Sequence, residues 1–511
     1  MLNFIEENKE KWIKFKSNNI GEKILIEEPS YPPVAHVNAV FALILNQAKG
    51  YRPVWLHDKV CKSEELLKSY VENSQIIKNR RLNFFYKVYI LLVSIIKFIK
   101  IYFTKDVLSF KFQGIRYGDI LYDTYLIQNN LATVDHIKLK MIKFIILCLY
   151  RHLEIKKILT SDNYKAVLVS HQVGISCGVM LRVALKFGYD GYLRCGHHKV
   201  TLQRFTKLDE VYDYEYKPSV SEIEIIIDKY GDHLDEEYKR ILDIQVSGRG
   251  TKDGQFAFSS KNKWYKDKES FNKDYRLDIN KKNVFVMLHA FNDHPHSHFR
   301  WMIFRDYYDW FIQTLEFAKK NNHVNWIFKQ HPSAKWYKTK DVVVDRLFDD
   351  VYSNIRYISE DTQIDTRSLV SCADLVVTCL GSAGFEIPAM GAIPSLTASD
   401  NFYSNLGFVI EPTTKEEYFE ALVKANEVNK LSVDLQNKAK ATFIFIYDKS
   451  RVAFSAAPQL SMSDEKDPKI EDWYFDRVIK QYELNKDKII SEVDNYINKV
   501  KRDNFKKLIS L

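Results

Sequence analysis

Residues 283–403 contain three short apolar runs, and polar residues follow each run directly. The runs are Val284-Phe285-Val286-Met287-Leu288 before His289, Trp326-Ile327-Phe328 before Lys329-Gln330-His331-Pro332-Ser333, and Leu375-Val376-Val377-Thr378 before Gly381-Ser382-Ala383-Gly384. A helix-like segment, residues 306–320, separates the first two runs. Short buried strands that alternate with helices predict a parallel α/β sheet. Because ligands bind beyond the carboxyl ends of such strands, we expect these polar clusters to form a site.

The N-terminal half predicts a second layer of the same kind. Residues 23–28 and 52–56 read as strands on either side of an apolar helix at 34–49, which is a β-α-β unit. A further strand, residues 166–170, ends at His171 and precedes a helix at 175–187. The polar, lysine-rich residues 247–280 resemble a linker.

We therefore predict an α/β protein with two Rossmann-like domains that face one another across a cleft. The first domain covers residues 1–280 and includes a basic amphipathic insert at 78–105. The second covers 281–460, and C-terminal helices at 461–511 are expected to return to the first domain.

The composition bounds the class of protein. A chain of 511 residues with 46% hydrophobic and 28% charged residues is long enough for several globular domains. The net charge of +9 favours anionic ligands or membrane headgroups and does not indicate nucleic acid. The six cysteines include no C-x-x-C pair, and residues 1–16 have no signal-peptide core, so we expect a cytoplasmic protein with free thiols.

The basic insert has two interpretations. No acidic residue lies between Glu72 and Asp106, whereas lysines, arginines and aromatic residues alternate there. The longest uncharged run, residues 88–96, is far shorter than the roughly 20 residues of a membrane span. The segment is either a helix in a membrane interface or a helix packed on its own domain with solvated lysines.

The second domain has the features of a nucleotide-phosphate site. Pro332 fixes the chain where it leaves its strand, so the His331 imidazole can donate to a phosphate oxygen. The backbone N–H groups of Gly381-Ser382-Ala383-Gly384 precede a helix and suit an anion, although the glycines alone could reflect turn geometry. Glu386, in the first turn of that helix, is expected to accept hydrogen bonds from a ribose. The residues predicted to bind the nucleotide-containing ligand are His289, His331, Pro332, Thr378, Gly381, Ser382 and Glu386.

In the first domain, two residues are candidate bases, and a metal site is not predicted. Asp119 either caps a helix or is a functional carboxylate, and His171 is either a structural hydrogen-bonding group or a catalytic one.

Asp293, His294 and His298 could suggest a metal site, but Pro295 favours a loop over a ligand-bearing helix. We therefore expect no metal and no cofactor.

Several of these motifs resemble a known family. The H-P motif, the G-S-x-G-x-E segment, Gly391-Ala392-Ile393-Pro394 and Asp400-Asn401-Phe402-Tyr403 are similar to those of bacterial GT-B glycosyltransferases of surface-carbohydrate (capsule or lipopolysaccharide) biosynthesis. These proteins are related in motif to transferases that use CMP-activated Kdo or sialic acid, and more distantly to CDP-glycerol polymerases.

The resemblance implies transfer of a sugar from a nucleotide-activated donor to a glycan or lipid-linked acceptor at the inner face of the cytoplasmic membrane, without a metal. His331 and Ser382 would hold the donor phosphates. The paired acidic-acidic-Gly motif of the CMP-sugar enzymes is missing, and its nearest counterparts are Asp190-Gly191 and Gly118-Asp119. The expected base is Asp119, ahead of His171. The alternatives are a nucleotide-sugar epimerase and a non-catalytic polysaccharide-assembly protein.

Overall fold

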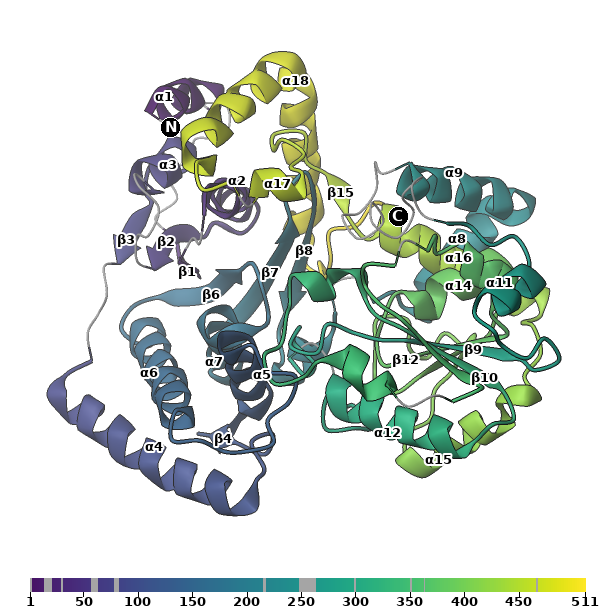
Figure 1. Cartoon of the computed structure of the whole chain (residues 1–511). Helices are drawn as coiled ribbons and strands as arrows, with labels where there is room; N and C mark the ends of the chain where they lie inside the picture. The colour runs from purple at the N-terminus through teal and green to yellow at the C-terminus, as the bar shows by residue number, and fades with distance from the viewer. Residues whose placement is uncertain are drawn as a thin grey trace. The chain divides into compact units, whose positions relative to one another are not determined.

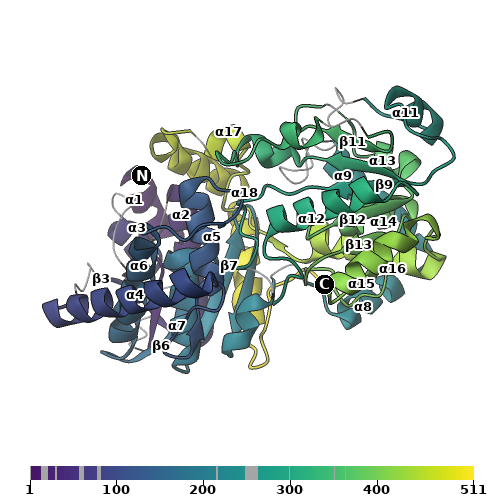
Figure 2. The same cartoon turned by 60° about the horizontal axis from the view of Figure 1, so that its bottom comes forward.

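The chain folds into two compact units. The computed structural model describes all residues except 1, 13–20, 29–30, 57–62, 78–81, 215–216, 248–262, 298–299, 350–351, 363 and 466. Unit 1 comprises residues 1–124, 136–215 and 451–510, and unit 2 comprises 125–135, 216–450 and 511. Figures 1 and 2 show that each unit is built of helices around one central sheet.

The sheet of unit 1 has the strand order β15-β8-β7-β6-β1-β2-β3. Its strands are β1 (Lys23–Ile26), β2 (Arg52–Leu56), β3 (Gln75–Ile77), β6 (Tyr164–Val169), β7 (Asp190–Gly196), β8 (Lys199–Phe205) and β15 (Val452–Ala453). The strands from β3 to β7 are parallel, and β8 and β15 are antiparallel additions. The chain winds outward from β1 to β3 and then restarts at β6 on the other side of β1.

The helices of unit 1 are α1 (Leu2–Lys11), α2 (Pro32–Lys49), α3 (Ser63–Tyr70), α4 (Phe84–Thr104), α5 (Gly118–Asn129), α6 (Met141–Leu159), α7 (Val179–Lys186), α17 (Met462–Glu465) and α18 (Ile470–Lys501), and a small hairpin is formed by β4 (Lys111–Phe112) and β5 (Ile115–Arg116). Although α5 begins in unit 1, its last residues belong to unit 2. Helix α2 is mostly apolar and almost wholly buried, which is typical of a central helix.

The C-terminal helix α18 completes the core of unit 1. It packs against α2, and Figure 1 shows it in yellow beside the purple N-terminal helices. The Tyr474 hydroxyl lies 3.0 Å from Nδ1 of His36, and burial lowers the pKa of His36 to about 3. Asn485 has non-helical backbone angles, so α18 consists of two helical segments joined at a kink.

The sheet of unit 2 is wholly parallel, with the order β11-β10-β9-β12-β13-β14. Its strands are β9 (Asn283–Met287), β10 (Asn325–Lys329), β11 (Ile355–Ile358), β12 (Leu375–Thr378), β13 (Ser395–Thr397) and β14 (Val409–Ile410). Its helices are α8 (Val220–Tyr230), α9 (Leu234–Val246), α11 (Lys268–Asp274), α12 (Tyr307–Lys320), α13 (Ser368–Cys372), α14 (Ala383–Gly391), α15 (Lys415–Val423) and α16 (Val433–Ile444).

Alternate residues of β9 and β10 in unit 2 enter two different cores. Val286 and Phe328 pack with residues of α12 and α15, whereas Phe285 and Ile327 pack with residues of α13 and α14. A strand whose two faces are both buried reads as a continuous apolar run, which is the pattern seen in the sequence. The predicted fold class, α/β with two Rossmann-like layers, is confirmed.

The division between the units differs from the predicted boundary at residue 280. Helices α8 and α9 pack on α16, and the rings of Tyr238 and Phe443 lie 5.1 Å apart, so residues 217–247 belong to unit 2. The predicted linker lies partly outside the described residues, at 248–262. Its remainder is packed, because Phe271 and Leu277 are buried in the core beside α13. Residues 451–460, in turn, belong to unit 1 through β15.

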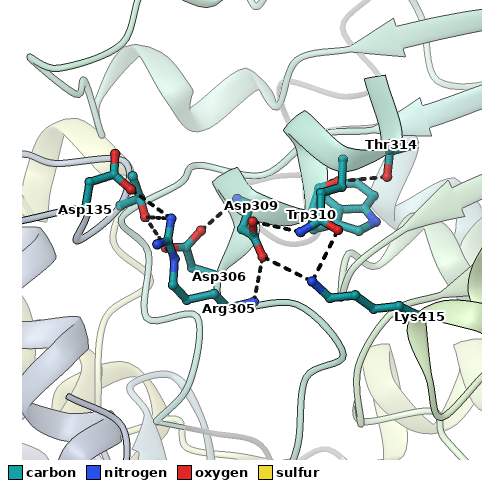
Figure 3. A network of polar contacts seen from close by, with 9 residues as sticks. Asp135, Arg305, Asp306, Asp309, Trp310, Thr314 and Lys415 are labelled. Carbon is teal, nitrogen blue, oxygen red and sulfur yellow. Dashed lines mark hydrogen bonds and ion pairs between the residues drawn. The ribbon is translucent and has the colours of Figure 1, made fainter. Parts of the chain in front are cut away.

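Residues 125–135 also join unit 2, and a polar network on α12 explains why (Figure 3). The Thr133 hydroxyl donates to Asp306 at 2.6 Å, and Arg305 binds Asp135 at 2.9 Å. The same Asp306 caps α12 by accepting the Asp309 N–H at 2.8 Å. This one carboxylate therefore starts a helix and anchors a segment that is distant in sequence.

We predict that Asp306→Ala lowers the free energy of unfolding by about 2–4 kcal/mol, because it removes a helix cap and leaves the buried Thr133 hydroxyl without its acceptor. The control is Thr414→Ala, which removes the exposed cap of α15 and should cost only about 1 kcal/mol. Urea unfolding of both variants measures the difference, and equal losses would contradict the anchoring role of Asp306.

Candidate functional site

The chain reverses its winding direction between β9 and β12. From β9 the chain proceeds to β10 and β11 on one side, and from β12 it proceeds to β13 and β14 on the other. The loops after two such strands diverge, which creates the crevice where parallel α/β sheets bind ligands. His289 follows β9, residues 379–382 follow β12, and His331 follows β10. The structure thus brings the three predicted polar clusters to one edge of one sheet.

His289 and Thr378 fix the loop between β12 and α14. Nε2 of His289 accepts the Leu380 N–H at 3.1 Å and lies 3.2 Å from the Thr378 hydroxyl. Thr378 Oγ1 in turn accepts the Gly381 N–H at 2.9 Å. A Cβ on Gly381 would lie only 2.9 Å from that oxygen, so the loop requires a glycine there. Both predicted side chains thus use polar atoms to hold this loop in place.

The protonation of His289 follows from its surroundings. Its ring stacks on Tyr307 with the ring centres 4.3 Å apart. Burial, and next the neighbouring charge of His331, lower the pKa of His289 to about 3. The ring is therefore neutral at physiological pH, and because Nε2 accepts, its proton is on Nδ1.

His331 is oriented by the turn that follows it. Pro332 begins the 3-10 turn Pro332–Lys335, and Nδ1 of His331 accepts the Ser333 N–H at 3.1 Å. A neutral ring that accepts at Nδ1 carries its proton on Nε2, which makes Nε2 a hydrogen-bond donor. Such a donor is suited to a phosphate oxygen.

The N-terminus of α14 is shaped by Tyr403. The Tyr403 hydroxyl donates to the Gly381 carbonyl at 2.8 Å, and a Cβ on Gly384 would lie 1.9 Å from that hydroxyl. Ser382, the N-cap residue, is exposed. Glu386 is buried and accepts a hydrogen bond from the Tyr447 hydroxyl. Ser382 is therefore accessible, and the Glu386 carboxylate is oriented by its neighbour.

Lys329, which the sequence analysis did not single out, is the unusual charge at this edge. It is the last residue of β10 and lies in register with Met287 of β9, which is in register with Thr378 of β12. Registered side chains of parallel strands share a face, and this is the face that α14 covers.

The Lys329 side chain is only 6% exposed, and among the described residues no carboxylate pairs with its ammonium. Desolvation lowers the pKa of Lys329 to about 8. A buried cation without an anion costs stability, so this lysine is a candidate ligand for an anion that binds here. In the sequence, Lys329 could have been identified as a candidate anion ligand because it ends an apolar strand two residues before His331.

Asp119, in unit 1, forms a buried ion pair. Its oxygens lie 2.7 and 2.8 Å from the two terminal nitrogens of Arg182, and the Tyr212 hydroxyl donates to it at 3.0 Å. Burial alone would raise the pKa of Asp119, but the Arg182 guanidinium holds it below its usual range. A carboxylate this well paired is a weak proton acceptor, so the geometry favours a structural role.

His171 lies at the corresponding switch point of unit 1, between β1 and β6. It is exposed and follows β6 by two residues. Glu27, which the sequence analysis also missed, follows the adjacent β1 and is buried. It accepts hydrogen bonds from Asn38 at 3.1 Å and from the Cys177 thiol at 2.7 Å. His171 is thus the more accessible of the two candidate bases.

Among the residues that the structure describes, no group of three or more His, Cys, Asp or Glu side chains could hold a metal ion. His298, one of the residues considered for such a site, lies outside the described residues.

We predict that Asp119→Asn destabilises the protein by about 3–5 kcal/mol, because it leaves the Arg182 guanidinium buried without its counter-ion. Glu64→Gln, which breaks an exposed pair with Lys68, is the control and should change stability by about 0.5 kcal/mol or less. Chemical unfolding compares the two variants. An Asp119→Asn protein as stable as the parent would contradict the structural role.

Comparisons with known proteins yield structural likenesses only. No protein-family model matches the chain, and no curated protein matches it in sequence. Among solved structures, the chain is similar to KpsC of Thermosulfurimonas dismutans, a beta Kdo 2,4 transferase, with 12% identity over 55% of this chain and 79% of that one and a TM-score of 0.33.

It is also similar to S. aureus MnaA in its UDP co-structure, with 11% identity, 91% and 97% coverage and a TM-score of 0.24. The wall teichoic acid polymerase TagF gives 10% identity, 94% coverage of both chains and a TM-score of 0.21. Likenesses at this level carry no argument about activity.

Proposed function

We propose that this protein is a glycosyltransferase that binds a nucleotide-activated sugar at the β9–β12 edge of unit 2 and transfers the sugar to a growing bacterial surface glycan. The observation that carries the proposal is the buried Lys329 ammonium, which has no carboxylate partner among the described residues and ends β10, the strand beside the β9–β12 switch point. An anionic ligand at this edge would supply the missing negative charge.

The donors at this edge match the chemistry of a leaving nucleotide. Glycosyl transfer builds negative charge on the departing phosphate, and preorganised cations and N–H groups stabilise that charge. Here the Lys329 ammonium, the Nε2–H of His331 and the Ser382 hydroxyl at the N-terminus of α14 would do so. In this proposal no metal is required.

Glu386 is proposed to bind the ribose. A carboxylate has about four lone-pair sites, so the hydrogen bond from Tyr447 orients Glu386 and still allows ribose hydroxyls to donate to it. His289, Thr378 and Gly381 then act indirectly, because they hold the loop that positions Ser382 and the first turn of α14.

His171 is proposed as the base that accepts the proton of the acceptor hydroxyl. A neutral imidazole can accept a proton, and His171 is exposed at a strand end. Asp119, the base expected from the resemblance, is engaged with Arg182, which supports His171 over Asp119.

We predict that Lys329→Met weakens binding of a nucleoside diphosphate by about 10-fold or more and at the same time stabilises the fold. The pKa of Lys329 is lowered from 10.5 to about 8, so below pH 8 the charged side chain destabilises the folded state by on the order of 3 kcal/mol. This cost shrinks as the pH rises above 8 and vanishes above the unfolded pKa. Ligand affinity of the parent should likewise fall above pH 8, as the ammonium loses its proton.

Calorimetry with CMP, CDP, UDP and GDP, together with thermal unfolding, measures both effects. Lys440→Met is the matched control, because Lys440 is equally buried but pairs with Asp235, and its loss should leave affinity unchanged without stabilising the fold. If Lys329→Met destabilised the protein and bound every nucleotide as tightly as the parent, the donor site would be elsewhere.

We predict that His171→Ala lowers transfer by roughly 10²–10⁴-fold with little change in donor affinity, because general-base catalysis contributes about that much. Product analysis with donor and acceptor measures the rate. Full turnover in His171→Ala would exclude His171 as the base. Conversion of the donor sugar in the absence of acceptor would instead indicate a nucleotide-sugar epimerase.

A further inference from the structure

Helix α4 has two apolar faces, and only one of them is covered. Ile90, Ser94, Phe98 and Ile101 are buried, and α4 packs against α6. Figure 1 shows α4 in dark blue as a long helix at the margin of unit 1, next to α6. A helix that merely completed the domain would have polar residues on its other side.

The opposite face of α4 is apolar and exposed. Phe85, Leu92, Ile96, Ile99 and Phe103 follow one another at seven, four, three and four residues, so they form one stripe along the helix. Phe85 is 80% exposed, Ile96 65% and Phe103 78%. Ile99 lies nine residues after the buried Ile90, which at about 100° per residue places the stripe on the side opposite the packed face. We refer to these five residues as the outer face.

The charges of α4 are all positive, and none lies on the outer face. At about 100° per residue, Lys100 lies beside the outer face, whereas Lys87 and Lys97 lie toward the packed face, and no acidic residue lies between Glu72 and Asp106. The long side chain of Lys100 can therefore extend toward headgroups while the apolar residues enter the acyl region, and the other two lysines add positive charge from the far side of the helix. None of the helices among the described residues is long and apolar enough to span a membrane.

We infer that α4 binds the surface of an anionic membrane, with its outer face inserted at the boundary between headgroups and acyl chains. Charge complementarity selects lipid over a second copy of this chain, because an anionic surface attracts a helix whose charges are all positive, whereas a second α4 would add like charge. This inference goes beyond the proposed transferase activity, since it concerns a surface in unit 1 that is separate in sequence from the proposed donor site.

Flotation of the full chain with lipid vesicles tests the inference. Vesicles of phosphatidylglycerol and phosphatidylcholine should bind the protein at low salt, and vesicles of phosphatidylcholine alone should bind it much more weakly. Replacing Lys87, Lys97 and Lys100 with Gln should weaken binding to the anionic vesicles by about fivefold or more, because Lys100 lies near the surface and contributes about fivefold, whereas Lys87 and Lys97 act from the far side of the helix. The control replaces the exposed Lys480, Lys486 and Lys488 of α18 with Gln and should have little effect.

A second variant, Leu92→Gln with Ile96→Gln, tests the outer face. Both side chains are exposed, so these changes leave the packed face of α4 intact. They should reduce binding to anionic vesicles at least tenfold, with an unchanged unfolding temperature. Equal binding of the parent to both lipids would overturn the inference, and so would full binding by this variant. A parent dimer in light scattering without lipid, lost in this variant, would show that a second copy covers the face instead.

Discussion

The proposed chemistry depends on one electrostatic constraint, the burial of the Lys329 ammonium at the end of β10 without a carboxylate partner among the described residues. The surrounding residues offer hydrogen-bond donors in place of a compensating negative charge. His331 carries its proton toward Nε2, and the N-terminus of α14 contributes a partial positive charge. An anion that binds at this edge would offset the positive charge of the buried Lys329 ammonium.

The contrast with Asp119 shows how burial separates two roles. Both residues are buried charges near a strand end or helix start, yet Asp119 has a bidentate partner in Arg182. Its pKa is held low, and its contribution is to the stability of unit 1. Lys329 has no such partner, its pKa is displaced toward neutrality, and it costs stability. A group that costs stability in the free protein is the better candidate for a ligand-binding role.

Local patterns predicted those parts of the fold that depend on local sequence. The apolar runs before His289, Lys329 and Thr378 are strands β9, β10 and β12, because strands buried on both faces need continuous apolar residues. The same reasoning failed at residues 263–280, where burial depends on a few residues such as Phe271 that contact distant strands. The partner of Asp119 lies 63 residues away along the chain, so its ion pair was not visible in local sequence.

The candidate site was predictable in position more than in detail. The positions of strand ends identified His331, Ser382 and the loop between β12 and α14. They did not reveal that His289 and Thr378 would hold this loop through their own hydrogen bonds. Nor did the sequence distinguish a solvated lysine from a buried one at residue 329, because that depends on how α14 covers the sheet.

The most direct measurement of the central claim is the pKa of Lys329 itself, followed by carbon-13 NMR of its ε-methylene, assigned with Lys329→Met. Without ligand the titration should centre near pH 8. Saturation with CDP or UDP should raise it by about two pH units, because an adjacent phosphate favours the charged ammonium. A titration that stays near pH 8 in the presence of a bound nucleotide would show that the phosphates do not lie beside Lys329 and would contradict the proposed site.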